Sequence, residues 1–189
     1  MPARDASRWN LRYQQERHRT FEDPRPFLVE HASLLPREGL ALDVAMGLGG
    51  NSGFLLQKGL RVVGIDISET AIRIAKAHLP GLMAFVADLT EYSLPRLNFD
   101  VILNFFYLQR DSWPVYLRIM KPGGLLIVQT LTEAMLQEQP EINPAYLLEQ
   151  GELLAGFKDW EILDYREGWE ENHPGHRRAV AGLVARKRA

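Results

Sequence analysis

The sequence of 189 residues contains no cysteine. This absence excludes disulfide frameworks, thiolate metal sites and cysteine nucleophiles, and it is compatible with a reducing cytoplasm. An excess of basic charge is also lacking, because 22 lysines and arginines stand against 24 acidic residues and give a net charge of -2. A whole-protein field that attracts nucleic acid is therefore not expected.

Long apolar runs are missing as well. No stretch approaches the roughly eighteen apolar residues of a membrane span, and residues 1–9 carry charges where a signal peptide has its apolar region. We therefore expect a soluble, unprocessed protein of the cytoplasm. The hydrophobic share of 46% is that of an ordinary globular chain. We expect a single domain over residues 1–189, with an N-terminal arm of residues 1–39 and a core of residues 40–189.

From residue 40 onward, short apolar runs alternate with segments of helical periodicity. This alternation is typical of β-α-β units and a mostly parallel sheet, so it predicts an α/β fold. The predicted strands are 40–44, 61–66, 82–86, 99–104 and 124–130, and the predicted helices are 51–58, 68–78 and 112–120. Ser68 is the predicted N-cap of the second helix, and Pro80-Gly81 closes it.

The pattern changes after residue 130. Pro140 and Pro144 interrupt the chain, and residues 145–155 are predicted to be helical. Residues 158–165 and 179–186 are rich in strand-forming side chains, which predicts a final antiparallel pair. The arm mixes arginines with aromatic residues, and we expect it to be helical and packed against the core.

Residues 43–51 read D-V-A-M-G-L-G-G-N and join a predicted strand to a predicted helix. Glycines at such a turn let the backbone approach a bound nucleotide or nucleoside closely. A dinucleotide site would have a third glycine where Ser52 stands. Asp43 also disfavours a pyrophosphate, because a carboxylate beside the turn repels phosphate and suits a cationic ligand. The simpler alternative is a tight strand-to-helix connection.

Two further acidic residues follow the next two strands. Asp66 has the spacing from the turn that suits hydrogen bonds from ribose hydroxyls. Asp88 can accept a hydrogen bond from an adenine amino group, while Ile67 and Leu89 could hold the ring between them. A helix cap or turn is the alternative role for Asp88, and a plain surface carboxylate is the alternative for Asp66.

Together these residues resemble the class I S-adenosylmethionine-dependent methyltransferases. Residues 43–49 are similar to their D-x-G-x-G-x-G motif, with Ala45 in place of the first glycine. Residues 49–55, G-G-N-S-G-F-L, and the arm element W-N-L-R-Y of residues 9–13 resemble the tellurite-resistance methyltransferase family and related small-molecule methyltransferases. The resemblance implies a Rossmann-like sheet of seven strands in the order 3-2-1-4-5-7-6, with the last strand antiparallel and helices on both faces. It also implies S-adenosylmethionine as cofactor and S-adenosylhomocysteine as product.

The site residues follow from the motifs and the resemblance. The expected cofactor-binding residues are Asp43, Ala45, Met46, Gly47, Gly49, Asn51, Asp66, Ile67, Asp88, Leu89, Asn104 and Phe105, joined by Arg12 and Tyr13 of the arm. The expected catalytic residues are Tyr107 after the fourth strand and His176 and Arg177 in the 171–178 hairpin. The arm and the hairpin could instead be purely structural. No metal is expected, because the histidines lack a ligand cluster of defined spacing.

The resulting functional hypothesis is methyl transfer from S-adenosylmethionine to a small-molecule acceptor. The alternatives are methylation of RNA or of a protein, and a non-catalytic nucleoside-binding protein of the same fold. An NAD-dependent oxidoreductase is disfavoured by Asp43 and Ser52. The sequence does not specify the oligomeric state or the acceptor atom, which could be oxygen, nitrogen, sulfur, selenium or tellurium.

Overall fold

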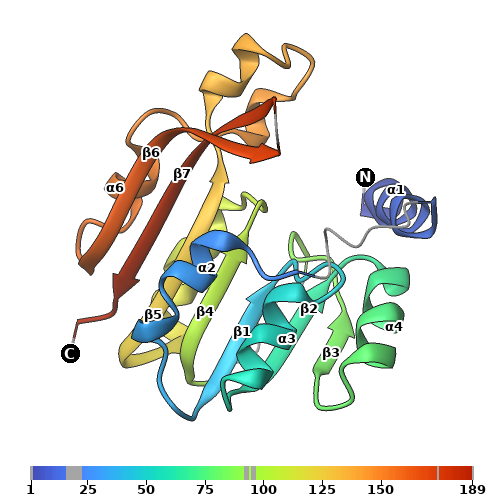
Figure 1. The fold of residues 1–189 in the computed structure, drawn as a ribbon, viewed down its shortest axis with the longest axis vertical. Coiled ribbons are helices and arrows are strands. Elements are labelled where there is room, and N and C mark those ends of the chain that lie inside the picture. Colours follow the sequence, from blue (N-terminus) through green and yellow to red (C-terminus); the bar gives the residue numbers. More distant parts are fainter. Residues whose placement is uncertain (1, 16–22, 92–93, 95–96, 174, 189) are drawn as a thin grey trace.

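The fold was analysed in a computed structural model, which describes residues 2–15, 23–91, 94, 97–173 and 175–188. Seven strands form one sheet in the order β3-β2-β1-β4-β5-β7-β6, which confirms the expected order. The strands are β1 (Leu40–Val44), β2 (Arg61–Asp66), β3 (Met83–Val86), β4 (Phe99–Phe105), β5 (Met120–Leu131), β6 (Glu161–His173) and β7 (His176–Arg186). Figure 1 shows the strongly twisted sheet with the long β6–β7 hairpin at one side.

Strands β1 to β5 run parallel to one another, and β7 is antiparallel to both β5 and β6. Parallel strands all end at the same edge of the sheet, so the turns that follow β1, β2, β3 and β4 are brought together there. The central strands are buried on both faces and read as continuous apolar runs, as parallel strands do.

Helices cover both faces of the sheet (Figure 1). Helices α2 (Pro26–Glu30), α3 (Gly50–Gln57) and α4 (Glu69–His78) pack on one face, and α5 (Trp113–Ile119) and α6 (Glu152–Gly156) on the other. Short 3₁₀ turns are present at Ala32–Leu34, Arg110–Ser112, Glu133–Gln137 and Pro144–Tyr146. Ser68 caps α4 as predicted, because its hydroxyl accepts a hydrogen bond from the backbone N–H of Ala71.

The N-terminal arm contains helix α1 (Pro2–Gln15), which packs against α4 and confirms the predicted helical arm. In Figure 1, α1 lies beyond the sheet on the side of α4, whereas the tip of the β6–β7 hairpin lies on the side of β5. Residues 16–22 of the arm lie outside the described residues. Within the described chain, no helix is long and apolar enough to span a membrane.

The prediction of a helix over residues 145–155 was wrong for most of its length. The backbone of Leu148 instead bonds the end of β5, donating to Leu131 and accepting from Glu133. Gly151 has a left-handed φ of 71° and begins the short helix α6. A left-handed residue in the middle of the segment cannot continue a helix, so the α-helix is confined to the last turn of the segment, and a single 3₁₀ turn at Pro144–Tyr146 precedes it.

The last two strands are longer than predicted. They extend to His173 and from His176, so the polar 171–178 segment is mostly paired strand rather than turn. Strand β5 also begins earlier, at Met120. Its pairing with β4 shifts register between Phe99 and Val101, which accommodates the extra residues around Gly123.

Candidate functional site

The glycine-rich turn lies at the carboxyl end of β1. Gly47 has a φ of 55° and Gly49 a φ of 84°, and Gly49 is the N-cap of α3. A Cβ at Gly47 would stand 2.9 Å from the hydroxyl oxygen of Tyr13, and one at Gly49 would stand 3.1 Å from Leu79. The turn therefore needs glycine both for its left-handed backbone and for space.

Two non-glycine residues of the turn have different roles. Ala45 has a φ of 53°, the left-handed conformation for which the related motif uses glycine. The side chain of Met46 is buried and fills the space above Gly64 in β2. Met46 can therefore offer a ligand only its backbone.

Asp43 is a buried residue of β1, just before the glycine-rich turn. It is 2% exposed, and its carboxylate accepts a 2.6 Å hydrogen bond from the Ser52 hydroxyl of α3. Burial raises the pKa of Asp43 to about 7, the nearby charge of Asp66 adds to the rise, and the Ser52 bond and Arg25 oppose it. The contact with Ser52 links β1 to α3 and fixes the position of the turn between them.

Asp66 links the turn to the following helix. Its two carboxylate oxygens accept hydrogen bonds of 2.8 Å from the backbone N–H groups of Gly47 and Ser68. Burial raises the pKa of Asp66, and these backbone hydrogen bonds partly offset the rise. Each oxygen keeps a further lone pair for a ligand hydroxyl.

Asp88 follows β3 and has a local role. One of its oxygens accepts hydrogen bonds from both the backbone N–H and the hydroxyl of Thr90, at 2.8 and 2.7 Å. Asp88 therefore stabilises a turn, the alternative role considered from the sequence. Its second carboxylate oxygen accepts no hydrogen bond from Thr90. Ile67 and Leu89, the two apolar residues at the same edge, are both half-buried.

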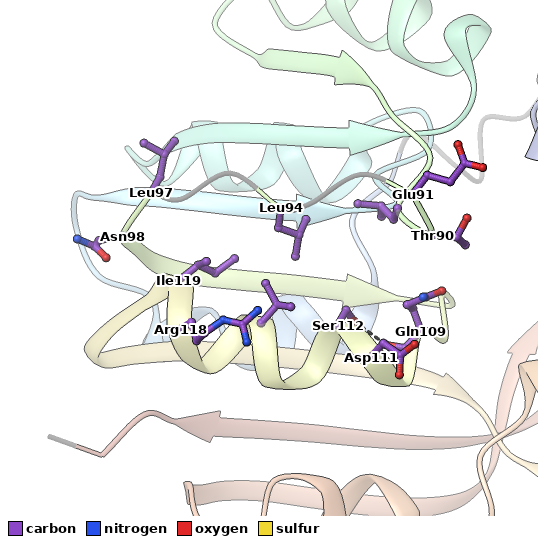
Figure 2. Close-up of a pocket in the computed structure, with 12 residues that line it drawn as sticks. Thr90, Glu91, Leu94, Leu97, Asn98, Gln109, Asp111, Ser112, Arg118 and Ile119 are labelled. Atoms are coloured by element: carbon purple, nitrogen blue, oxygen red, sulfur yellow. Dashed lines mark hydrogen bonds between the residues drawn. The ribbon is translucent and has the colours of Figure 1, made fainter.

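A cavity of about 660 Å³ lies beside Leu89, between the β3–β4 connection and α5. Figure 2 shows Leu94, Leu97 and Ile119 on its apolar side and Gln109 and Asp111 at one end. The described residues of the β3–β4 connection form no helix. Leu94 of this connection is buried in the core on the α5 side of the sheet.

The end of β4 contributes a buried amide and two aromatic residues. Asn104 donates to the Tyr116 hydroxyl at 2.8 Å, while its own Oδ1 is buried and has no hydrogen-bond partner among the described residues. The side chain of Phe105 is buried in the core on the α3 side. Tyr107 is half-buried and donates to Gln109, and burial holds the pKa of Tyr107 well above its usual range, so its phenol stays protonated.

The arm contacts the turn directly. Tyr13 is buried against Leu48 and Ala71, and it stacks on Trp9 with ring centroids 5.8 Å apart. Asn10 anchors the helix, because its side-chain oxygen accepts hydrogen bonds of 2.7 Å from the Ser68 hydroxyl and 3.0 Å from the backbone N–H of Thr70. The W-N-L-R-Y element of the arm did not indicate that Asn10 would bind the start of α4.

Arg12 of the arm is exposed, and its guanidinium lies 5.2 Å from the centroid of the Trp9 ring. The side-chain oxygen of Asn51 accepts a 2.9 Å hydrogen bond from the backbone N–H of Arg25. That bond holds the segment before α2 close to the first turn of α3.

Two adjacent arginines of the β6–β7 hairpin have side chains that point to opposite faces of the sheet. Arg177 forms an ion pair with Glu138 and lies 4.3 Å from the centroid of the Trp169 ring. Arg178, the next residue of β7, lies 5.1 Å from the Phe106 ring that follows β4. Adjacent strand residues point to opposite faces, so the arginine that reaches the strand ends is Arg178 and not the expected Arg177. His176 is exposed at the start of β7.

Comparison with known proteins agrees with this geometry. Residues 41–124 match the family described as "Methyltransferase domain", which is somewhat less than half of the chain. A probable S-adenosylmethionine-dependent methyltransferase of Mycolicibacterium smegmatis is 27% identical, over 67% of this chain and 55% of the relative. The chain spans about half the length of the first curated relatives that it matches.

Other similarities extend over more of the chain. A thiopurine S-methyltransferase of Francisella tularensis subsp. novicida is 26% identical, over 84% of this chain and 81% of the relative. The crystal structure of TehB from Haemophilus influenzae superimposes with a TM-score of 0.74 and 21% identity, over 87% of this chain and 62% of that one. At that identity the superposition shows a shared fold.

Proposed function

Because the chain belongs to the class I S-adenosylmethionine-dependent methyltransferases, we propose that it transfers the methyl group of S-adenosylmethionine to a small molecule. The single observation that carries the proposal is the convergence of Asp43, Asp66 and Asp88 at one edge of the sheet, around a turn built on Gly47 and Gly49.

The residues present fit the cofactor of this family. The free lone pairs of Asp66 can accept from the ribose hydroxyls, and the second oxygen of Asp88 can accept from the adenine amino group. Ile67 and Leu89 would flank the adenine ring. The buried Oδ1 of Asn104 lacks a donor among the described residues, and the ammonium group of the methionine portion would supply one.

The cofactor supplies a methyl group already activated on a sulfonium, so the chain mainly has to align the acceptor and exclude water. Tyr13 covers Gly47, and we assign the arm the role of closing the cofactor edge. The protonated Tyr107 does not act as a base, and its one hydroxyl proton, which is donated to Gln109 in the structure, would have to turn to reach the acceptor. Phe106 and Tyr107 would form the wall against which the acceptor lies.

A small acceptor is favoured over a macromolecule by two observations. The thiopurine methyltransferase relative, which by its name acts on a small molecule, matches over most of both chains. The net charge of -2 gives no general attraction for RNA. RNA or protein methylation, and binding without turnover, are the alternatives that the test must separate. The cytoplasm is the proposed place of the reaction, with which the lack of cysteine is compatible.

The test starts from calorimetry with S-adenosylhomocysteine and the Asp66→Asn variant. Asparagine keeps the shape of the side chain but loses the charge, so binding should weaken by about 30- to 1000-fold, which corresponds to roughly 2 to 4 kcal/mol. Asp159→Asn, which changes an exposed carboxylate before β6, is the control and should bind within about twofold of wild type. An unchanged dissociation constant for Asp66→Asn, or tighter binding of NAD by the wild type, contradicts the assignment.

The second measurement is turnover, followed as release of S-adenosylhomocysteine in the presence of small thiols, phenols, amines and carboxylates. Product with at least one small acceptor supports the proposal. Tight cofactor binding with product only on RNA or protein, or with no product at all, would instead support the corresponding alternative.

A further inference from the structure

A second cavity lies on the α6 side of the sheet, between the segment that follows β5 and strand β6. Its volume is about 840 Å³, which is in the range of small-molecule sites. The segment after β5 contains the 3₁₀ turn Glu133–Gln137, which packs against β7. In Figure 1 this segment lies beside the β6–β7 hairpin, away from α4. The described residues that line the cavity include none of those expected to bind the cofactor, so the cavity is a separate site.

Two glycines line the cavity with backbone conformations that other residues rarely adopt. Gly151 at the start of α6 has a φ of 71°, and Gly168 in β6 has a φ of 155°. A Cβ added to either glycine would meet no atom within 4 Å. Crowding by neighbouring side chains therefore explains neither glycine, and the backbone is open to a ligand at both. A glycine within a strand often marks a place where a ligand approaches the backbone closely.

The apolar part of the cavity consists of Leu136 and Leu154 together with two aromatic side chains of β6. Tyr165 and Trp169 are both half-buried, and each packs on a buried apolar cluster. Side chains alternate along a strand, so Tyr165, Glu167 and Trp169 point to the same face of β6. The faces of tryptophan and tyrosine rings attract organic cations. A carboxylate between two such rings has the same preference.

That carboxylate, Glu167, is held in a fixed position. Its Oε2 accepts hydrogen bonds from the Tyr165 hydroxyl and, at 2.9 Å, from the backbone N–H of Gly151. Burial and the hydrogen bond to Glu167 raise the pKa of Tyr165 well above its usual range, so the phenol keeps its proton. The other carboxylate oxygen, Oε1, accepts from neither group and can accept from a ligand.

The side-chain charge that faces the cavity is negative. Glu133 and Glu167 supply two carboxylates. Arg166 is the one basic residue among the described residues that line the cavity. Its guanidinium, however, is directed to the opposite face of the sheet, where it pairs with Glu30 and lies 4.4 Å from the centroid of the Phe27 ring. The backbone of Arg166 can contact a ligand in the cavity, but its charge is used on the α2 side.

One further arginine lies near the cavity without lining it. The guanidinium of Arg177 lies 4.3 Å from the centroid of the Trp169 ring and forms a 2.6 Å ion pair with Glu138. This arginine and its carboxylate together add no net charge to the neighbourhood. The charge balance of the cavity therefore remains negative.

We propose that this cavity binds a small organic cation, whose charged nitrogen faces the carboxylates of Glu133 and Glu167 and whose apolar body packs on Trp169. The nitrogen of an amine can donate to Oε1 of Glu167, and partial burial strengthens the attraction between the two charges. The apolar body would cover Leu136 and Leu154 from water. An anion would meet two like charges in the same place. The inference concerns a ligand other than cofactor and acceptor, and it does not depend on the methyltransferase function.

The experiment is calorimetry on the full chain at low ionic strength, because salt screens the attraction of exposed charges. The probes are phenethylamine and benzyltrimethylammonium as cations, phenethyl alcohol as the neutral counterpart and hydrocinnamate as the anion. We expect phenethylamine to bind about tenfold or more tightly than phenethyl alcohol, and hydrocinnamate to bind most weakly. Benzyltrimethylammonium has no N–H group, so its binding measures the ring and charge contributions alone.

Glu167→Gln is the main variant. Its amide oxygen can still accept from Tyr165 and Gly151, so the local structure is kept while the charge is removed. Phenethylamine binding should weaken by about tenfold or more. Glu133→Gln, at an exposed position, should weaken it by only about threefold, since solvent screens that carboxylate.

Two further variants make the result specific. Glu161→Gln is the matched control, because Glu161 is an exposed glutamate of the same strand that does not line the cavity. Its affinity for both cations should stay within about twofold of wild type. Trp169→Leu should weaken benzyltrimethylammonium by about threefold or more, through loss of the ring face. Circular dichroism of each variant shows whether the fold is kept.

Each result decides the inference. Preferential binding of the cations, lost in folded Glu167→Gln and kept in Glu161→Gln, supports it. Equal binding of phenethyl alcohol and phenethylamine, or no binding of either cation, overturns it. Cation binding that Glu167→Gln leaves unchanged also overturns it, because the cations then bind elsewhere on the acidic surface. None of these outcomes changes the case for S-adenosylmethionine, which is tested by Asp66→Asn.

Discussion

Ala45 occupies a backbone conformation that costs energy at the scale of one residue. Its φ of 53° is left-handed, a region that glycine adopts freely and alanine does not. Ala45→Gly should raise the free energy of unfolding by about 1 kcal/mol, which is roughly 2 to 4 °C in Tm for a chain of this size. Urea unfolding followed by circular dichroism measures it.

The matched control for this substitution is Ala41→Gly in β1, the strand that precedes the turn. Ala41 is fully buried in β1 and pairs with Val62 and Val101 in regular strand geometry. There glycine should destabilise, because it loses buried contacts and gains freedom in the unfolded chain. Destabilisation by both substitutions would show that the turn does not store strain at Ala45.

The raised pKa of Asp43 predicts that the free energy of unfolding falls as the pH rises. Its pKa is about 7 in the folded protein against a reference value of 3.8, so between these values the folded state holds a proton that the unfolded state has lost. The stabilisation from Asp43 is complete below pH ~4 and is lost as the pH rises through 7. Asp43→Asn stays uncharged and should lack this loss.

The measurement is urea unfolding of wild type and Asp43→Asn at pH 5, 7 and 8.5. As the pH rises, the unfolding free energy of wild type should fall relative to that of Asp43→Asn. A constant difference for Asp43→Asn across the three pH values would mean that this carboxylate titrates near its ordinary value.

Among the elements, helix α1 is held on α4 by side chains that include Asn10 and Gln14. Asn10 accepts from Ser68 and Thr70 at the start of α4. Asn10→Ala should loosen the helix and with it Tyr13 over the glycine turn, weakening S-adenosylhomocysteine binding by roughly 5- to 30-fold, as expected for loss of about 1 to 2 kcal/mol. Calorimetry gives the affinity, and circular dichroism confirms that the core is intact.

Leu11→Ala is the control for the same helix, because Leu11 is 52% exposed. Its affinity should match that of wild type. If Asn10→Ala binds as tightly as Leu11→Ala, the arm is not part of the cofactor site and only packs on α4.

The sequence predicted those elements whose pattern is local. Strands β1 and β2 and the capped helix α4 have periodicity and end signals within their own residues. The segment 145–155 was predicted wrongly, because Leu148 bonds to Leu131, a contact that local periodicity does not contain. The turn and its carboxylates were likewise predictable from spacing.

The acceptor side was less predictable for a related reason. Which of Arg177 and Arg178 faces the strand ends depends on the register of β7, and one residue of shift reverses the answer. Arg25 has no motif around it and reaches Phe106 only through the folded chain. Residues that meet by tertiary packing leave no periodic trace in the sequence.

For the whole molecule, ligand binding should be visible as thermal stabilisation. A ligand that binds only the folded state at about 100 times its dissociation constant adds about 2.7 kcal/mol. S-adenosylhomocysteine at that level should therefore raise Tm by roughly 5 to 10 °C. Differential scanning calorimetry measures the shift, with NAD at the same concentration as the control. An equal shift with NAD would contradict the proposed cofactor.

The two outer strands of the sheet decide whether copies of this chain can join through their backbones. Strand β3 has only four residues, which is too short a ladder to recruit another strand effectively. Strand β6 is long, but its pairing with β7 shifts register twice, and acidic side chains recur along it at Glu161, Asp164, Glu167, Glu170 and Glu171. Irregularity and like charge at an open edge oppose edge-to-edge association and amyloid-like growth, so the sheet ends at seven strands.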